Sequence, residues 1–347
     1  MKFKKILYLI IFAFCCLLTG CFSEIAAEPA AEGSLQVHFI SVGQGNAVLA
    51  ESDGHYMLID GGDASHSSKV ISYLKEQGVK KLDYVIATHY DADHLSGILG
   101  AIKVFPTDIL LDPDYTTDTK LFSSYLKAKK ELSLTSVHPA SGDTYSLGSC
   151  NFTILAPNST GYSNENDYSI ALRLVCGSTS FLMTGDAGID SEEEMLRTGL
   201  TLNSDVYLTG HHGSSTSNSE DFLEAVSPSY AVISVGRGNS YGHPHREVMT
   251  SLSARGIPVF RTDTQGTILV ESDGKSLTFN TQPDTQFEEH ASSSQDTSLP
   301  FIGNKNTKKF HRSDCSGLPK EHNRIYFKTA KEALNEGYEP CANCRPN

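Results

Sequence analysis

The chain has 347 residues, of which 39% are hydrophobic and 20% are charged, and its formal net charge is −13. This composition is typical of a globular protein, and it excludes a polytopic membrane protein, a chain disordered throughout, a collagen and a coiled-coil rod. The acidic balance also argues against a protein that holds nucleic acid through a broad basic surface. The charge is uneven, because residues 21–302 carry 16 basic and 36 acidic side chains, a net charge of −20, whereas residues 303–347 carry a net charge of +4.

The first twenty residues have the pattern of an export signal. Three lysines precede an apolar stretch at 6–18, which is too short to span a membrane comfortably. The sequence LTGC at 18–21 then matches a bacterial lipobox, in which the thiol of Cys21 receives the lipid. An uncleaved short anchor is the alternative. We therefore expect residues 1–20 to be a lipoprotein signal peptide, 21–34 to be a tether, and the protein to be lipid-anchored to the bacterial membrane on its extracytoplasmic side.

The next part of the chain, up to about residue 280, alternates apolar runs with helical spacings. Along its first half, the pattern predicts strands over 35–42, 47–51, 55–60 and 83–88 and helices over 68–77 and 95–104. Along its second half, it predicts strands over 179–185, 206–210 and 230–235 and a helix near 246–254. Strands that alternate with helices are typical of an α/β domain.

The most informative feature follows the apolar strand at 83–88. His89, Asp91, Asp93 and His94 lie within six residues, at a strand end where a curling loop can bring their side chains to one point. Carboxylates and imidazoles are the ligands that hold a hydrolytic divalent ion. A solvated polar loop is the alternative, but this spacing is rare by chance, so the motif predicts a metal site.

Three further segments place polar groups directly after predicted strands. Asp186 follows the strand 179–185, although an Asp in a turn is weak evidence by itself. His211 and His212 follow the strand 206–210, and two adjacent histidines at a strand end seldom serve a core. His243 lies in the sequence YGHPH, whose alternative interpretation is a proline-capped helix start with a solvated histidine.

The order of these motifs resembles the metallo-β-lactamase superfamily. The residues that carry the resemblance are LIDGG at 58–62, THYDADH at 88–94, TGD at 184–186, HHGS at 211–214 and YGHP at 241–244. More narrowly, they resemble the hydrolase domain attached to ComEC-type competence DNA-uptake channels. The resemblance covers residues 35–280 and implies an αββα sandwich with a one- or two-metal site on its rim.

The resemblance also implies a role for each motif residue. The metal ligands are His89 and Asp91 for one divalent ion, Asp93 and His94 for a second, Asp186 as a bridge, and His211 or its neighbour His212 to complete the second site. The catalytic residues are Asp93 and His243, of which His243 faces the substrate and donates a hydrogen bond or a proton. Asp60 orients the ligands, and Asn166 and Ser214 line the pocket.

The chain departs from the superfamily pattern in two ways. The usual H-x-H-x-D-H is H-x-D-x-D-H here, so Asp91 replaces an imidazole. A separate histidine expected before Gly185-Asp186 is missing, since His138 has no metal-like context and Asn166-Asp167-Tyr168-Ser169 stands there instead. The more anionic site shifts the preference from Zn²⁺ towards Mn²⁺, and it makes a β-lactamase activity less expected.

The expected function is that of an exported two-metal phosphodiesterase or nuclease that cleaves DNA through a hydroxide held between the ions. The net charge of residues 21–302 counts against DNA, so two alternatives stay open. One is hydrolysis of another ester, such as a wall-polymer phosphodiester or a lactone. The other is a non-catalytic, surface-binding lipoprotein. No protein partner is predicted.

A polar linker at 281–302 precedes a small basic segment at 303–347. Its sequence supplies H-x3-C and C-x2-C, the four ligands of a closed structural Zn²⁺ site, at His311, Cys315, Cys341 and Cys344. A disulfide is the alternative in an oxidising compartment, although three cysteines are an odd number. The segment resembles the Ada-type metal-binding module, with His311 in place of the first of four cysteines, so a methyl-accepting repair activity is not expected. Whether Cys150 and Cys176 pair is left open by their spacing.

Overall fold

The structure is a computed structural model. It describes residues 33–284 and, in the C-terminal module, residues 301–347 apart from 313, 314, 316, 320–322, 328, 343, 345 and 347. The predicted signal peptide and the predicted lipidation site, Cys21, lie outside the described residues, as do the predicted tether up to residue 32 and most of the predicted linker.

Two sheets form the body. The first has eight strands in the order β15-β14-β1-β2-β3-β4-β5-β6. Their bounds are β1 (Leu35–Phe39), β2 (Val48–Ser52), β3 (His55–Ile59), β4 (Leu82–Ile86), β5 (Thr107–Leu111), β6 (Ser136–Val137), β14 (Ile268–Ser272) and β15 (Leu277–Phe279). The second has seven strands in the order β13-β12-β11-β10-β9-β8-β7. Their bounds are β7 (Thr144–Leu147), β8 (Cys150–Ala156), β9 (Ala171–Cys176), β10 (Thr179–Met183), β11 (Val206–Leu208), β12 (Tyr230–Ile233) and β13 (Val259–Arg261).

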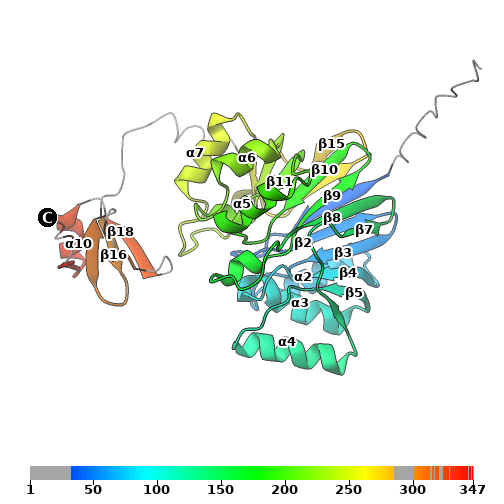
Figure 1. Cartoon of the computed structure of the whole chain (residues 1–347), viewed down its shortest axis with the longest axis horizontal. Coiled ribbons are helices and arrows are strands. Elements are labelled where there is room, and N and C mark those ends of the chain that lie inside the picture. The colour runs from blue at the N-terminus through cyan, green and yellow to red at the C-terminus, as the bar shows by residue number, and fades with distance from the viewer. Residues whose placement is uncertain are drawn as a thin grey trace, which may run out of the picture.

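Helices cover the outer face of each sheet (Figure 1). The first sheet packs against α2 (Ser67–Glu76), α3 (Ala92–Val104) and α4 (Lys120–Glu131), and the second against α5 (Ile189–Thr198), α6 (Glu220–Val226) and α7 (Arg246–Ala254). Shorter turns of helix are η1 (Glu165–Tyr168), η2 (Gly210–Gly213) and α8 (Thr262–Gln265).

Alternating side chains of the strands build this layering. Along β1, Leu35, Val37 and Phe39 face the core between the two sheets, where they meet Phe152 and Phe181 of the other sheet. Side chains at the alternate positions of the first sheet's strands face the core under α2–α4 instead, as Leu49, Leu58 and Val85 do. Because successive residues of a strand point to opposite faces, each sheet contributes to two cores. The αββα sandwich predicted from the sequence is thereby confirmed.

The parallel strands of each sheet determine where the polar motifs meet. In the first sheet β3, β4 and β5 run parallel, and in the second β10, β11 and β12 do so. Parallel strands end at a common edge, and ligands bind in open α/β sheets beyond the carboxyl ends of their strands. Asp60 follows β3, the H-x-D-x-D-H motif follows β4, Asp186 follows β10, and His211 and His212 follow β11. The sandwich therefore brings all of these segments to one rim.

One predicted boundary near the motif is wrong. Helix α3 begins at Ala92 rather than at residue 95, because Asp91 keeps an extended backbone (φ −67°, ψ 151°) and its carbonyl accepts the N–H groups of His94 and Leu95. Asp93 and His94 consequently lie in the first turn of a helix and not in a free loop. The helix fixes their side chains more firmly than a loop would.

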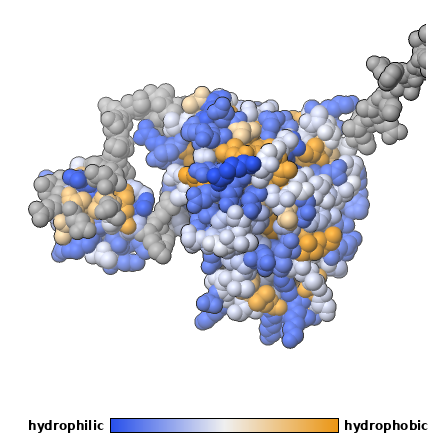
Figure 2. Space-filling view, in the orientation of Figure 1, coloured by the Kyte–Doolittle hydropathy of each residue, from blue (hydrophilic) through white to orange (hydrophobic). Residues whose placement is uncertain are grey.

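A disulfide joins β8 to β9. Cys150 and Cys176 are bonded, with their Cα atoms 4.5 Å apart. This settles the alternative that their spacing leaves open. Among the described residues no helix is long and apolar enough to cross a membrane. Figure 2 shows apolar residues in small groups among hydrophilic ones on the displayed face of the body.

The C-terminal module has its own sheet, in the order β18-β16-β17-β19. Its elements are β16 (Phe301–Asn304), β17 (Lys309–Arg312), β18 (Arg324–Phe327), α10 (Ala330–Asn335) and β19 (Glu339–Pro340). Phe310, Phe327, Ala333 and Tyr338 form a small buried apolar cluster in the described part of the module. So small a core seldom stabilises a fold without a metal ion or a disulfide.

Candidate metal centre

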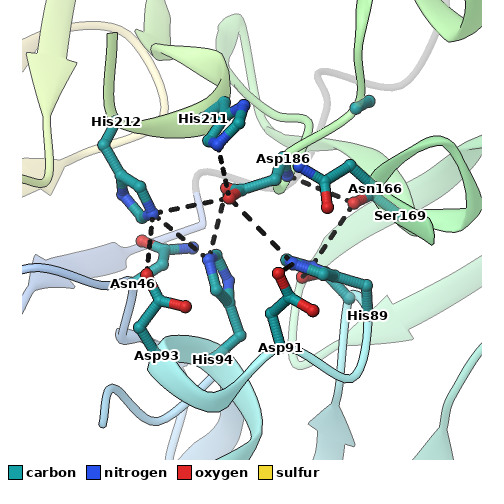
Figure 3. Close-up of polar contacts among 12 residues, drawn as sticks. Asn46, His89, Asp91, Asp93, His94, Asn166, Ser169, Asp186, His211 and His212 are labelled. Atoms are coloured by element: carbon teal, nitrogen blue, oxygen red, sulfur yellow. Dashed lines mark hydrogen bonds and ion pairs between the residues drawn. The ribbon is translucent and has the colours of Figure 1, made fainter. Parts of the chain in front are cut away.

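The carboxylate of Asp186 lies at the middle of the converging motifs (Figure 3). Its Oδ1 is 3.2 Å from Nε2 of His94, and its Oδ2 is 3.5 Å from Nε2 of His212. Oδ2 also lies 3.5 Å from Nε2 of His211 and 4.0 Å from Nε2 of His89. The side chain is buried, so four imidazoles surround one carboxylate that is shielded from water.

Two sets of ligand atoms share this space. His89, His94 and Asp186 form one set, and Asp93, His94 and His212 form the other, with the ligand atoms of each set within 4.8 Å of one another. Asp91 lies at the edge of the first set, where its Oδ2 is 3.9 Å from Nε2 of His89 and its side chain is 50% exposed. In the second set, Oδ2 of Asp93 is 3.4 Å from Nε2 of His212.

The environment of His89 tests whether these residues suit a cation. The ring is completely buried, and its Nε2 has no hydrogen-bond partner among the described residues. Its other nitrogen, Nδ1, lies 3.1 Å from the hydroxyl of Thr88. A buried imidazole nitrogen without a partner costs free energy unless something binds it. Imidazoles and carboxylates are ligands that Zn²⁺ and Mn²⁺ accept, so the residues fit divalent ions.

Asp60 is a buried carboxylate that orients one ligand of this centre through a hydrogen bond. The carboxylate is fully buried and accepts hydrogen bonds from the backbone N–H and hydroxyl of Thr88 and from the amide of Asn46. It also accepts the Nδ1–H of His94 at 2.7 Å. This bond directs Nε2 of His94 towards Asp186, which is how a carboxylate partner orients a metal-binding imidazole. The structure therefore places Asp60 where the predicted orienting residue is needed.

Opposite charges tune the ionisation of the cluster. Burial by itself raises the pKa of the Asp186 carboxyl, but His94, His212 and His211 together hold that pKa well below its usual range. Burial likewise opposes ionisation of Asp93, and His212 and His94 outweigh it, so the pKa of Asp93 is lowered. Both carboxylates are therefore ionised at neutral pH, which is the state that binds a cation.

The two adjacent histidines have different surroundings. His212 is buried and donates its Nδ1–H to the carbonyl of Ser234 at 2.9 Å, which leaves Nε2 facing Asp93 and Asp186. His211 is 22% exposed and contacts Asp186 only through Oδ2, while its Nδ1 lies 3.1 Å from the hydroxyl of Thr216. Of the pair, only His212 belongs to a described set of ligand atoms.

His243 lies next to this pair but outside both sets. Its ring is 5.3 Å from that of His211, measured between centroids, and Tyr241 stacks over it. Burial, followed by the neighbouring His211, His212 and His245, lowers the pKa of His243 to about 3. Neither ring nitrogen has a hydrogen-bond partner among the described residues. Both nitrogens are themselves buried, so the contact of His243 with a substrate stays a prediction.

The two predicted pocket residues differ in position. Asn166 lies half-buried in η1, and Figure 3 shows its side chain beside Asp186. Ser214 is completely buried, and its hydroxyl lies 3.0 Å from that of Thr216. Its side chain is enclosed within the turn that follows the two histidines, and its predicted role in lining a pocket stays a prediction.

Sequence reasoning missed several supporting residues. Asn46 bonds Asp60, Ser234 bonds His212, and the Ser169 hydroxyl accepts the backbone N–H of Asp186 at 3.2 Å. Asn46 follows Gly43-Gln44-Gly45, which has no sequence signal beyond that of a tight turn. These polar residues are ordinary by type, and only the fold reveals which buried group each of them contacts.

A second ligand cluster lies in the C-terminal module. His311, Cys315, Cys341 and Cys344 have ligand atoms within 4.8 Å of one another, and Nδ1 of His311 is 3.4 Å from Sγ of Cys315. Four nitrogen and sulfur donors match a closed tetrahedral zinc site. The four residues predicted from their spacing are thus brought together, and they fit a structural zinc ion.

Two family models match the chain. The model described as the metallo-beta-lactamase superfamily matches residues 40–237, and the one described as the metal binding domain of Ada matches residues 290–347. ComE operon protein 3 of Bacillus subtilis (strain 168) is 29% identical over 273 residues, which cover 74% of this chain and 35% of that protein. Competence protein ComA of Neisseria gonorrhoeae is 31% identical over 254 residues, which cover 73% of this chain and 34% of that protein.

This chain therefore spans about a third of the length of these curated relatives. Among solved structures, the metallo-beta-lactamase fold protein YhfI from Bacillus subtilis aligns with a TM-score of 0.48 at 17% identity, over 69% of this chain and all of that one. The matched family models cover the four ligands of the C-terminal module and every motif of the body except YGHP at 241–244. The chain belongs to the metallo-beta-lactamase superfamily, is related to competence proteins, and has an Ada-type metal-binding module at its C-terminal end.

Proposed function

We propose that the body of this protein is a two-metal phosphodiesterase that cleaves DNA. The observation that carries the proposal is the position of Asp186, whose carboxylate contacts His89 on one side and both His94 and His212 on the other. A carboxylate of one ligand set that also contacts a histidine of the other is suited to hold two ions close together. Two-metal sites of this kind serve phosphatases and nucleases, among other hydrolases.

In this proposal each ligand set holds one ion. His89 would hold the first with help from Asp91 at its edge, Asp93, His94 and His212 would hold the second, and Asp186 lies between the two groups of ligands. When bound, the ions supply ionisation of a water molecule at neutral pH and positive charge beside the attacked phosphorus. The residues of the chain hold the ligand side chains in place, keep water away from their buried side and donate a hydrogen bond to the substrate.

His243 is the residue that meets the leaving group. Its low pKa keeps the imidazole neutral at pH 7, so one ring nitrogen carries a proton that it can donate as a hydrogen bond. The carbonyl of His243 accepts the amide of Asn239 at 2.6 Å, and its backbone N–H donates to the Asn239 oxygen at 3.1 Å. These two bonds hold the residue in place beside His211.

The relatives support DNA as the substrate. One is named a competence protein and another, Recombination protein 2 of Haemophilus influenzae, is 29% identical over 255 residues. The net charge of residues 21–302 opposes the binding of a polyanion. Two divalent ions would offset that charge at the site itself, because they supply four positive charges beside the carboxylates of Asp91, Asp93 and Asp186.

A cleavage assay tests the proposal. The full chain is loaded with Mn²⁺ or Zn²⁺ and supplied with single- and double-stranded DNA, bis-p-nitrophenyl phosphate and a lactone. We expect cleavage of both phosphodiesters, lost in Asp93→Asn and retained in Asp190→Ala, whose carboxylate is exposed on α5. Metal-loaded protein that hydrolyses the lactone but neither phosphodiester would refute the proposal.

The net negative charge of residues 21–302 favours one other candidate function, the hydrolysis of an uncharged ester such as a lactone. A neutral substrate meets no repulsion from a body with a net charge of −20. The two functions differ in which substrate competes for the site. DNA should inhibit turnover of bis-p-nitrophenyl phosphate if the site binds DNA, and it should have no effect if the natural substrate is a neutral ester.

We also propose that the protein is lipid-anchored through Cys21, outside the cytoplasmic membrane. The lipobox at 18–21 and the apolar stretch before it support this location. The test compares the native chain with Cys21→Ser in membrane fractions of a bacterial host. We expect the variant to be released from membranes, and its unchanged retention would refute acylation as the anchor.

A further inference from the structure

The turn that carries His211 and His212 has a backbone that side chains seldom adopt. Both residues are left-handed, with φ 50° and ψ 47° at His211 and φ 56° and ψ 28° at His212. For residues other than glycine this region is sparsely populated, because Cβ approaches the carbonyl oxygen. Two such residues in succession persist only where the surroundings determine the conformation.

Asn218 supplies that restraint. Its Oδ1 accepts the backbone N–H of Gly210 at 3.0 Å and the hydroxyl of Tyr207 at 2.9 Å. Its Nδ2 donates to the carbonyl of Gly210 at 3.0 Å and to that of Ser214 at 2.9 Å. These four bonds use both hydrogens and both lone pairs of the amide. A single buried side chain thus ties the start of the histidine turn to its end.

Asn218 is itself held from the opposite side. Its backbone N–H donates to Oε1 of Glu192 at 2.5 Å, and the N–H of Ser219 donates to Oε2 of the same carboxylate at 2.9 Å. Glu192 is completely buried in α5. Asn218 has φ 64°, a conformation that asparagine tolerates better than most residues. The restraint therefore runs from α5 through Asn218 to the turn.

We infer that Asn218 is a positioning residue that holds His212 in the geometry that faces Asp93 and Asp186. Asn218 is 5% exposed and belongs to neither ligand set, so it acts through the turn and does not touch a metal ion or a substrate. The inference rests on the metal centre of the proposed function. It extends the support of the centre beyond Asp60, which orients a different histidine.

The chemistry of the amide explains why neighbouring residue types would not serve. Aspartate has no hydrogens to donate to the carbonyls of Gly210 and Ser214, and its charge would repel them. Glycine accepts the left-handed backbone but makes none of the four bonds. Asn218→Asp and Asn218→Gly therefore remove the restraint in two independent ways, the first with little change of volume and the second without backbone strain.

Metal binding by the full chain tests the inference. We titrate metal-free protein with Co²⁺, count the ions bound and record the visible spectrum, while far-UV circular dichroism reports the fold. Both variants should bind one ion of the body about 10- to 100-fold more weakly, with a changed spectrum. The matched control is Asn203→Ala, which removes a hydrogen bond to the carbonyl of Val226 far from the turn and should bind Co²⁺ like the unmodified chain.

The outcomes separate this inference from the proposed function. Folded Asn218→Asp with unchanged affinity and spectrum would overturn the positioning role. Should neither variant fold, hydrogen exchange at the Gly210 amide of the metal-free, unmodified chain decides: slow exchange supports the restraint, and exchange as fast as in an open loop overturns it. Unmodified protein that binds its ions but cleaves no phosphodiester would refute the proposed function and leave the positioning role standing.

Discussion

Replacing Asp60 by asparagine is the sharpest test of how the centre is supported. Oδ2 of the carboxylate accepts both the Nδ1–H of His94 and the amide of Asn46. In Asp60→Asn one carboxylate oxygen becomes an NH₂ group. If the new amide keeps its oxygen towards Thr88, two buried donors then lose their acceptor. Each such loss costs about 1–3 kcal/mol, so the free energy of unfolding of metal-free protein should fall by about 3 kcal/mol.

The histidine can respond in only one favourable way, and that response damages the metal site. Burial lowers the pKa of His94, but Asp186 and Asp60 outweigh it and raise the pKa well above its usual value, so metal-free protein carries protons on both ring nitrogens. If the variant releases the Nδ1 proton and keeps the one on Nε2, then Nδ1 accepts a hydrogen bond from the new amide and part of the stability returns. Nε2, however, is the atom that faces Asp186 and His212, and a protonated nitrogen cannot bind a metal ion. The variant must therefore lose stability, metal affinity or both, and the affinity loss should reach about 10- to 100-fold.

Two measurements with a matched control decide the matter. Urea unfolding of metal-free protein gives the stability, and titration with Zn²⁺ or Mn²⁺ gives the affinity. The control is Asp63→Asn, a change in the same turn, where the side chain is 39% exposed and bonds, within the described part of the chain, only to Ser65 and His66. We expect the control to change stability by less than about 0.5 kcal/mol. Unchanged stability together with unchanged affinity in Asp60→Asn would refute the supporting role of this carboxylate.

Three further predictions follow from the same contacts. Asp91→His should raise the affinity for Zn²⁺ relative to Mn²⁺ in competition titrations, because an imidazole replaces a hard carboxylate. The position is half-exposed and therefore accepts the larger ring. An unchanged ratio of the two affinities would mean that Asp91 is not a ligand. The double variant Cys150→Ser/Cys176→Ser lacks the disulfide, which closes a loop of 26 residues, and its free energy of unfolding in urea should be lower by about 3.5 kcal/mol. A reductant should lower the free energy of unfolding of the native chain by the same amount and leave that of the double variant unchanged. Cys344→Ser should remove one tightly bound zinc ion per chain, and with it the dispersed NMR signals of the C-terminal module. Hydrolysis by the body should be unchanged. A variant that retains this zinc ion would exclude Cys344 from the site.

Much of the site could be predicted because metal ligands have unusual residue types. Histidine and aspartate clustered after an apolar strand seldom serve a core, so His89, Asp93 and His94 stand out. Asp186 joined them through the order of the motifs, and the structure brings these residues together in two overlapping ligand sets. The order of predicted strands and helices likewise identified the α/β class. Both patterns involve residues that are close together in the sequence, so they can be recognised before the fold is known.

The remaining features depend on contacts between distant segments. Asn46 meets Asp60 across 14 residues and Asn218 meets Glu192 across 26, and neither pair has a local signature. The choice between His211 and His212 depends on a carbonyl of Ser234, 22 residues away. Ser214 follows a motif histidine and still faces inward, since its turn curls back on itself. Such partners become visible only once the strands are paired.

The net charge of the body leads to a last prediction, on how salt affects the reaction. A protein that grips DNA through many lysines and arginines loses affinity as salt rises, because counterions compete for the phosphates. Residues 21–302 instead carry a net charge of −20, which repels DNA outside the reach of bound ions. Raising NaCl from about 50 to 200 mM shortens the screening length from roughly 14 to 7 Å and weakens that repulsion. The KM for DNA should then fall, by about two- to threefold if a few phosphates are involved, while the KM for a neutral ester stays constant. A KM for DNA that rises steeply with salt would place the DNA on the basic C-terminal module and not on the metal centre alone.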